Sequence, residues 1–248
     1  MTEFLDIGEV RRLAYKHRRG RSPTLVFLPG YMSDMAGGKA SALDAWAGET
    51  GRAMLRFDYG GCGASEGAFA EQDLTAWRDD VIAFLDRVVE GPAVLVGSSM
   101  GGWLMLLAAL ARPERVAGLV GIAAAPDFTS WGFTEEEKAR ILADGRLEQP
   151  SPYVEQSMIT TRAFWESGEA LKLLGGPIAI DCPVRLLHGQ ADADVPWRNS
   201  LELARQLRSA DVQATFIKDG DHRLSRPQDI ALLIATVESL LELPCFRP

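Results

Sequence analysis

Residues 97–101, Gly-Ser-Ser-Met-Gly, contain a serine in the spacing G-x-S-x-G. The apolar residues 93–96 before it predict a buried strand, and the uncharged, Ala/Leu-rich segment after it, up to about Arg112, predicts a helix. A serine on such a strand-to-helix turn is held clear of the backbone, where it can act as a nucleophile. Because Ser99 has a glycine two residues away on each side, which leaves room for a tight turn, it is the candidate rather than Ser98.

Two other interpretations of this stretch must be weighed. The spacing alone is common enough that it could mark a loop without chemistry. Residues 92–111 are also uncharged and long enough to cross a bilayer. We expect no membrane span, because the Gly-Ser-Ser-Met-Gly-Gly core divides the run into a strand and a helix.

Two more polar groups follow predicted strands later in the chain. Strand 183–187 leads into a segment with aspartates at 192 and 194, and strand 213–217 leads into a segment with His222. The carboxyl ends of parallel strands lie along one edge of a sheet. A serine hydroxyl needs an imidazole to take its proton, and the imidazole needs a carboxylate to orient it. The chain order of serine, aspartate and histidine, each after a predicted strand, therefore predicts a triad of Ser99, one aspartate of 192–194, and His222.

His188 is expected to be a structural residue at the end of a strand and not a base, because Gly189 turns the chain directly after it. A tetrahedral intermediate also needs two preorganised N–H donors. We expect the backbone of Met100 to supply one, since it follows the nucleophile. The backbone of Tyr31, after the strand at 24–28, should supply the other and leave the Tyr31 side chain free to line the substrate pocket.

Composition narrows the class of protein. The 248 residues are 47% hydrophobic, which suits a single α/β domain over residues 1–248, and the net charge of −8 argues against a nucleic-acid partner. Three scattered cysteines form no disulfide framework or metal site, and the Gly60–Gly63 loop has the wrong spacing for a dinucleotide, so we infer no metal or cofactor. Because residues 1–6 include acids and no apolar leader, the expected location is cytoplasmic.

The elements around the candidate residues alternate between strands and helices. Strands that are apolar throughout predict a mostly parallel sheet covered by helices on both faces. Edge strands are expected within 4–15, and the clearest helix is 73–89. The remaining predicted strands and helices occupy 24–28, 39–50, 53–57, 116–124, 198–209 and a segment from about 227.

Residues 126–180 interrupt this alternation and predict a helical cap over the carboxyl edge of the sheet. A short helix should begin near Glu135 and another should span 162–174, and no strand is evident. The cap aromatics could face an acyl pocket or attach the cap to the body, and both can hold for different members of the set: Trp131, Phe133, Tyr153, Phe164 and Trp165.

Five stretches together resemble the α/β-hydrolase superfamily along nearly the whole chain. More narrowly, they resemble its mitochondrial palmitoyl-protein thioesterases, also described as acyl-glucuronide hydrolases, of the α/β-hydrolase-domain-containing group. The stretches are 27–33, 56–65, 96–105, 182–197 and 221–223.

The resemblance implies an α/β-hydrolase fold with an eight-stranded sheet, and a catalytic Ser99 and His222. The spacing His-Gly-x-x-Asp-x-x-Val-Pro selects Asp192 as the acid, with Asp194 as the alternative.

The sequence thus predicts a serine hydrolase that cleaves esters or thioesters of small molecules or acylated proteins through an acyl-enzyme. The alternatives are a small-ester carboxylesterase, a carbon–carbon bond hydrolase on the same fold, or a non-catalytic binding protein. The oligomeric state is not predicted.

Overall fold

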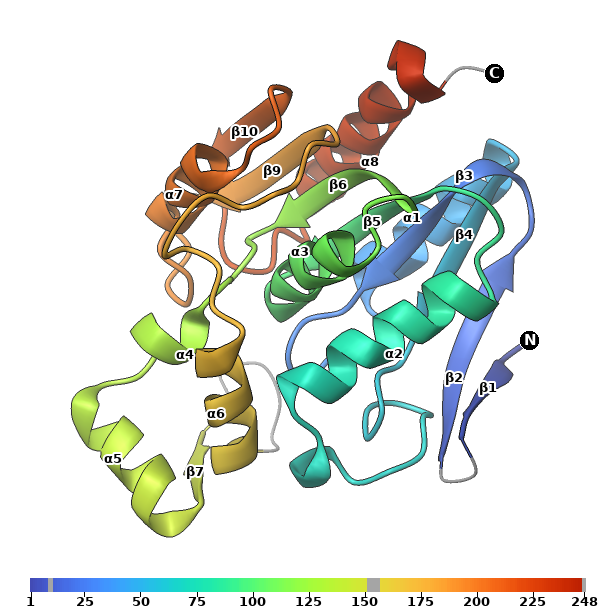
Figure 1. The fold of residues 1–248 in the computed structure, drawn as a ribbon. Coiled ribbons are helices and arrows are strands. Elements are labelled where there is room, and N and C mark those ends of the chain that lie inside the picture. Colours follow the sequence, from blue (N-terminus) through green and yellow to red (C-terminus); the bar gives the residue numbers. More distant parts are fainter. Residues whose placement is uncertain (9–10, 151–156, 247–248) are drawn as a thin grey trace.

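A computed structural model describes residues 1–8, 11–150 and 157–246, and it contains one large mixed sheet (Figure 1). The strand order is β1-β2-β4-β3-β5-β6-β9-β10, in which β1 and β2 are antiparallel to their neighbours and the other pairs are parallel. This confirms the predicted eight-stranded, mostly parallel sheet. Its strands are β1 (Glu3–Ile7), β2 (Arg11–Arg18), β3 (Arg21–Leu28), β4 (Arg52–Phe57), β5 (Ala93–Ser98), β6 (Val116–Ile122), β9 (Val184–Gly189) and β10 (Val212–Ile217).

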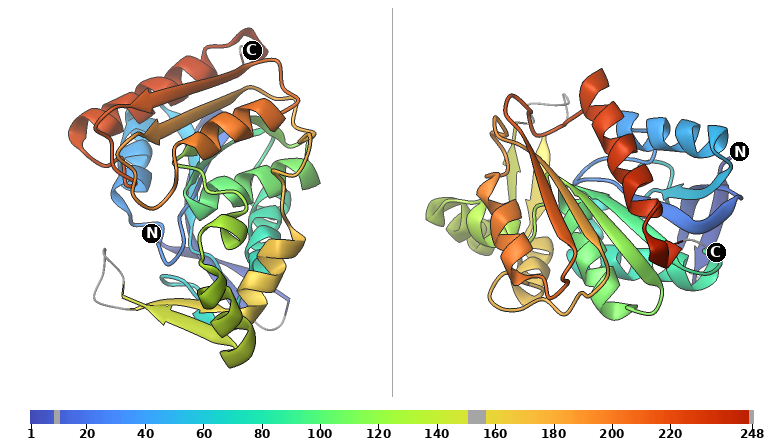
Figure 2. Two further views of the ribbon diagram at one scale, coloured as in Figure 1. Left: turned by 90° about the vertical axis from the view of Figure 1, so that its left-hand side faces the viewer. Right: turned by 90° about the horizontal axis from the view of Figure 1, so that it is seen from above.

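Helices cover both faces of the sheet, as Figure 2 shows from two further sides. One face packs under α2 (Leu74–Arg87), α3 (Met100–Ala111) and α7 (Arg198–Gln206), and the other under α1 (Gly38–Glu49) and α8 (Pro227–Leu241). Each face has its own apolar core, which accounts for strands such as β5 that are buried at every residue. Two short 3-10 helices, η1 (Phe69–Glu71) and η2 (Pro244–Phe246), complete this part of the fold.

The first turn of helix α3 lies too close to strands β5 and β3 for side chains at positions 97 and 101. A Cβ on Gly97 would lie 2.3 Å from the carbonyl oxygen of Gly101, and a Cβ on Gly101 would lie 2.1 Å from the carbonyl oxygen of Leu28. Only glycine fits at these two positions. The turn between them is therefore tight, and it holds Ser99 at the carboxyl edge of the sheet.

The predicted cap segment includes α4 (Phe128–Trp131), α5 (Glu135–Asp144) and α6 (Arg162–Ala170), which lie apart from the sheet in Figure 1. The α6 helix ends earlier than the predicted 174, because the Asp127 carboxylate accepts hydrogen bonds from the backbone N–H groups of Leu173 and Leu174, both at 2.8 Å. Asp127 thus joins the beginning of the segment to its end.

The expectation that this segment has no strand is wrong. Strand β7 (Arg146–Gln149) pairs antiparallel with β8 (Met158–Thr161) in a separate two-stranded sheet. Each strand has four residues and buries only one side chain, Leu147 or Thr160, so neither shows the apolar alternation that identifies a strand. Val10 of the predicted edge strand and Tyr153 of the cap lie outside the described residues.

Among the residues that the structure describes, no helix is both long enough and apolar enough to cross a membrane.

Gly101→Ala should destabilise the protein, because the added methyl group would collide with the backbone of β3 at Leu28. Overpacking of this kind costs about 2 kcal/mol of unfolding free energy or more, which corresponds to a fall in Tm of roughly 4 °C or more. Thermal unfolding followed by circular dichroism measures this. Gly175→Ala is the matched control, because nothing lies within 4 Å of the position that its Cβ would take, and its Tm should stay at the parent value. Equal Tm values for the two variants would contradict the close contact.

Candidate active site

Ser99 occupies the turn between β5 and α3 with a positive φ of 54°. Its N–H donates to the carbonyl of Ile122 at 2.9 Å, and its carbonyl accepts from Gly102 at 2.8 Å and Ala125 at 3.1 Å. These bonds hold a backbone conformation that costs a residue with a side chain of order 1–3 kcal/mol. The hydroxyl therefore projects from the turn instead of capping α3, which has no side-chain cap.

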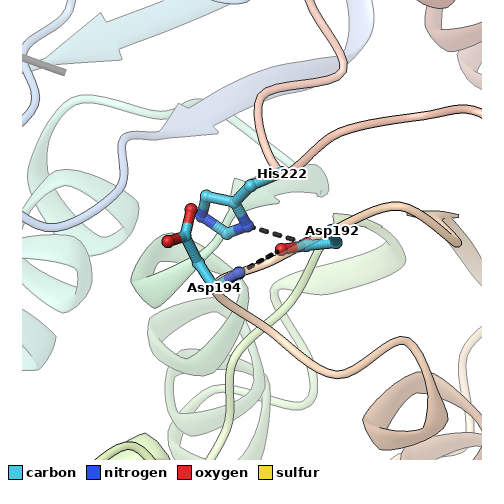
Figure 3. A group of neighbouring side chains, drawn as sticks. All are labelled: Asp192, Asp194 and His222. Carbon is cyan, nitrogen blue, oxygen red and sulfur yellow. Dashed lines mark hydrogen bonds and ion pairs between the residues drawn. The ribbon is translucent and has the colours of Figure 1, made fainter. Parts of the chain in front are cut away.

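The loops after β9 and β10 meet closely beside Ser99. A Cβ on Gly189 would lie 2.1 Å from the carbonyl oxygen of Gly220, and the Ala191 N–H donates to that same carbonyl at 3.0 Å. This contact brings Asp192 and His222 together, although they are 30 residues apart in the sequence (Figure 3).

Ser99, His222 and Asp192 form a continuous chain of hydrogen bonds. The Ser99 hydroxyl lies 3.1 Å from His222 Nε2, and His222 Nδ1 lies 2.8 Å from Asp192 Oδ2. The His222 side chain is 15% exposed and that of Asp192 is fully buried. The imidazole can therefore face both the hydroxyl and a substrate, while the carboxylate behind it is shielded from water.

Asp192 is a buried carboxylate whose hydrogen-bonding capacity is filled by N–H donors. Its Oδ1 accepts from the backbone of Asp194 at 2.9 Å and of Val195 at 2.8 Å, and its Oδ2 lies beside His222 and His188. Burial by itself would raise the pKa of Asp192, but the hydrogen bonds from His188 and His222 outweigh burial and hold the pKa well below its usual range. Asp192 is therefore ionised at neutral pH.

The alternative acid, Asp194, lies near the same histidine but is not bonded to its Nδ1. One of its carboxylate oxygens lies within 4.8 Å of Asp192 and His222 (Figure 3). Three such groups could in principle hold a cation. The oxygens of Asp192 are already occupied by N–H donors, which makes the group a poor metal site.

Sequence reasoning missed the contact between His188 and Asp192. His188 Nε2 lies 3.2 Å from Asp192 Oδ2, and the side chain is fully buried. The signal was the spacing of four residues between a strand-end histidine and the acid, but the spacing alone does not show which way the imidazole points.

The expected donors to an oxyanion adjoin Ser99. Met100 is the first residue of α3, so its N–H has no acceptor within the helix. On the other side, a Cβ built on Gly30 would lie 3.3 Å from Ser99 Cβ, which places the backbone before Tyr31 against the serine. The loop that carries Tyr31 is anchored further on, where the Met35 N–H donates to the buried Asp58 carboxylate at 2.7 Å.

The side chain of Tyr31 lines the cavity, as expected, and it is also held by the cap. Its hydroxyl donates to the carbonyl of Ile159 in β8, and burial raises its pKa. Its ring packs at 4.9 Å from the centroid of Phe164 in α6 and at 5.8 Å from that of Trp77 in α2. Tyr31 therefore joins the loop beside Ser99 to the cap and to the body.

A cavity of about 550 Å³ opens above Ser99 and His222. Phe128, Trp131, Phe133 and Met158 of the cap make one part of its wall apolar. Ser33, Lys39, Asp194, Arg223 and Ser225 make another part polar, with charges of both signs.

Lys39 anchors the histidine loop at the polar wall. Its ammonium group donates to the backbone carbonyl of Arg223, the residue after His222. Burial, together with the nearby Arg223 charge, lowers the pKa of Lys39 to about 8. This bond ties the start of α1 to the loop that carries the histidine.

The two roles considered for the cap aromatics are divided between them. Trp131 and Phe133 line the cavity. Phe164 is buried against Trp77 of the body with ring centroids 5.5 Å apart, and the Trp165 indole donates to Thr129 within the cap.

This chain is similar to several known proteins. Residues 21–142 match the family model described as serine aminopeptidase, S33. Palmitoyl-protein thioesterase ABHD10, mitochondrial, is 44% identical in Mus musculus and 42% in Homo sapiens, over 96% of this chain and 82% and 79% of the respective relatives.

Two solved structures are similar over the whole fold. The mouse alpha/beta hydrolase domain-containing protein 10 has a TM-score of 0.91 at 43% identity, and a protein from Agrobacterium vitis S4 has a TM-score of 0.91 at 39% identity. Each alignment covers 98% of both chains.

These relatives contradict the expected cytoplasmic location, because the names of the mouse, human, orangutan, rat and cattle proteins place them in mitochondria. The expectation rested on the first six residues, which do not decide the compartment.

Tyr31→Phe should loosen the cap, because it removes the hydrogen bond to Ile159 and keeps the ring. A loss of about 1 kcal/mol is expected, so amides of residues 158–161 should exchange with deuterium roughly 5-fold faster. Hydrogen exchange with peptide-level mass spectrometry measures this. Tyr15→Phe is the control, because the hydroxyl of Tyr15 donates to Glu3, at 3.4 Å, on the far edge of the sheet. Equal exchange at 158–161 in all three proteins would refute the anchoring role.

Proposed function

Because this chain belongs to the α/β-hydrolase family and hydrolyses ester or thioester bonds, we propose that Ser99, His222 and Asp192 are its catalytic triad. The observation that carries the proposal is the continuous chain of hydrogen bonds from the Ser99 hydroxyl to the Asp192 carboxylate at the floor of the cavity.

The distances suit proton transfer in the acylation step. His222 Nε2 takes the proton of Ser99 as the hydroxyl oxygen attacks the substrate carbonyl, and then gives it to the departing alcohol or thiol. Asp192 holds the proton on Nδ1, which leaves Nε2 able to accept, and stabilises the imidazolium that forms. His222 then activates water, which hydrolyses the acyl-Ser99 ester and frees the enzyme.

The negative charge of the tetrahedral intermediate needs donors on the side away from His222. We assign this role to the backbone N–H groups of Met100 and Tyr31. Met100 stands at the positive end of α3, where the helix dipole favours an anion. Tyr31 follows Gly30, whose lack of a side chain lets the loop approach Ser99 closely.

The cavity suggests how a substrate would lie. The apolar wall of cap residues, including Trp131 and Met158, suits the acyl chain, and the polar wall near Lys39 and Arg223 suits the leaving group. Relatives named palmitoyl-protein thioesterases favour a long acyl thioester, with an S-acylated protein as the partner.

A carboxylesterase for small esters is the competing substrate assignment. It would use the same triad and leave much of the 550 Å³ cavity unfilled. The two assignments differ in the dependence of rate on acyl length. A non-catalytic role is disfavoured, because each member of the triad is present and hydrogen-bonded.

Ser99→Ala should abolish turnover and leave the fold intact, because it removes one hydroxyl oxygen and no apolar packing atom. We expect kcat for p-nitrophenyl esters to fall by at least about 10³-fold, and covalent labelling by a fluorophosphonate to vanish. Ser98→Ala is the matched control and should keep both activities. Labelling that persists in Ser99→Ala would disprove the assignment of the nucleophile.

Acyl thioesters of increasing chain length should be hydrolysed with increasing kcat/KM, because each methylene buried on the apolar wall contributes about 0.8 kcal/mol, or about four-fold. The matched series of oxygen esters should rise in parallel if the cap binds the acyl chain alone. Trp131→Ala should flatten both series without lowering the rate for acetyl substrates. A kcat/KM that peaks at acetyl in the parent enzyme would instead favour the small-ester carboxylesterase.

A further inference from the structure

His188 is a second histidine on the carboxylate that orients the proposed base. It is the fifth residue of β9 and is fully buried. Its Nε2 lies 3.2 Å from Asp192 Oδ2 and 3.1 Å from the carbonyl oxygen of Val195, and its Nδ1 lies 2.7 Å from the Ser200 hydroxyl on α7.

These partners determine which ring nitrogen carries the proton. A carbonyl oxygen only accepts hydrogen bonds, so Nε2 must be the donor to Val195, and it shares the same proton with Asp192. Nδ1 is then free to accept from the Ser200 hydroxyl. The ring is fixed on both sides, by the acid loop and by α7.

The position of the ring excludes a direct catalytic role. Each of its nitrogens is committed to a partner away from the Ser99 hydroxyl, and His222 occupies the place beside that hydroxyl. What His188 does reach is the one oxygen, Asp192 Oδ2, that also accepts from His222.

We propose that His188 is a positioning residue that shares Asp192 Oδ2 with His222, orients the carboxylate and restrains its attraction for the imidazolium. The proposal rests on the triad proposed above. An oxygen that already accepts one hydrogen bond is a weaker acceptor for a second. His222 therefore releases its proton more readily to the leaving group, and it stays neutral and able to act as a base down to a lower pH.

The other charged groups around Asp192 and His222 remain the same when His188 is replaced. Asp194 comes from the acid loop and Lys39 from α1, while Asp221 and Arg223 flank His222 in the sequence. A change in the pH profile of a His188 variant would therefore come from the lost donor to Asp192.

Two amide variants separate the contact with Asp192 from the contact with Ser200. In His188→Gln the side-chain amide can place an N–H near the position of Nε2 and so keep the bond to Asp192. In His188→Asn the shorter amide mimics Nδ1, so it keeps a polar contact near Ser200 but does not reach Asp192. The measurement is kcat/KM for a p-nitrophenyl ester as a function of pH, together with Tm.

His188→Asn should lower kcat/KM by roughly 10-fold or more and shift its acid limb to higher pH by about half a unit. His188→Gln should stay within about three-fold of the parent with an unshifted limb. The proposal would be overturned if kcat/KM fell at the same acidic pH in the Asn variant, the Gln variant and the parent enzyme. Equal losses of kcat/KM in the two variants would overturn it as well. If the Asn variant does not fold, an acid limb that is shifted from the parent value in either the Gln variant or Ser200→Ala would overturn the proposal, because both variants keep the donor to Asp192.

A double-mutant cycle tests whether His188 acts through the carboxylate. The rate of His188→Asn/Asp192→Asn should equal that of Asp192→Asn alone, whereas multiplied effects would show that His188 acts elsewhere. The failure of the triad itself would appear separately, as fluorophosphonate labelling that survives Ser99→Ala.

Discussion

The close packing of β5 against α3 is the constraint on which the site depends. Gly97 lets β5 approach α3, and Gly101 lets α3 approach the end of β3, so the turn that joins β5 to α3 is tight and holds Ser99 at φ 54°. The Ser99 N–H donates to the carbonyl of Ile122 in the neighbouring strand, and the Ser99 carbonyl accepts from the N–H of Ala125 in the chain after that strand; both bonds hold this conformation. Packing of the cores on the two faces of the sheet offsets the free-energy cost of the Ser99 backbone conformation. The same packing therefore stabilises the fold and presents the hydroxyl.

A second constraint is electrostatic. A buried carboxylate is costly unless its oxygens are paired, and Asp192 meets that condition with two backbone donors and two imidazoles. The backbone donors come from its own loop, which curls around Oδ1. The imidazoles come from β9 and from the loop after β10, so adjacent strands must be in register before the charge is satisfied. The parallel sheet is in this sense a condition for an ionised acid beneath His222.

The sequence was most informative where the local residue pattern and the topology of a parallel sheet lead to the same structure. Buried apolar strands predicted the sheet, and strand-end positions predicted that Ser99, an aspartate of 192–194 and His222 would lie together. In the structure, hydrogen bonds join Ser99 to His222 and His222 to Asp192. It was least informative where tertiary contacts decide. Strands β7 and β8 exist because they pair with each other, not because of their own alternation. The orientation of His188 depends on Ser200 and Val195, and that of the Tyr31 hydroxyl depends on a carbonyl 128 residues away.

Tyr31 shows that chemistry and substrate choice are not independent in this fold. Its backbone belongs to the loop that stands against Ser99, while its hydroxyl and ring are held by the cap through Ile159 and Phe164. An acyl chain that displaces the cap aromatics must therefore move a residue proposed to bind the oxyanion. Conversely, a chain that fits between Phe128 and Trp131 without displacing the cap leaves that donor in place. Selection among acyl chains can then appear in kcat as well as in KM, because the same side chain connects the wall of the pocket to the reacting carbonyl.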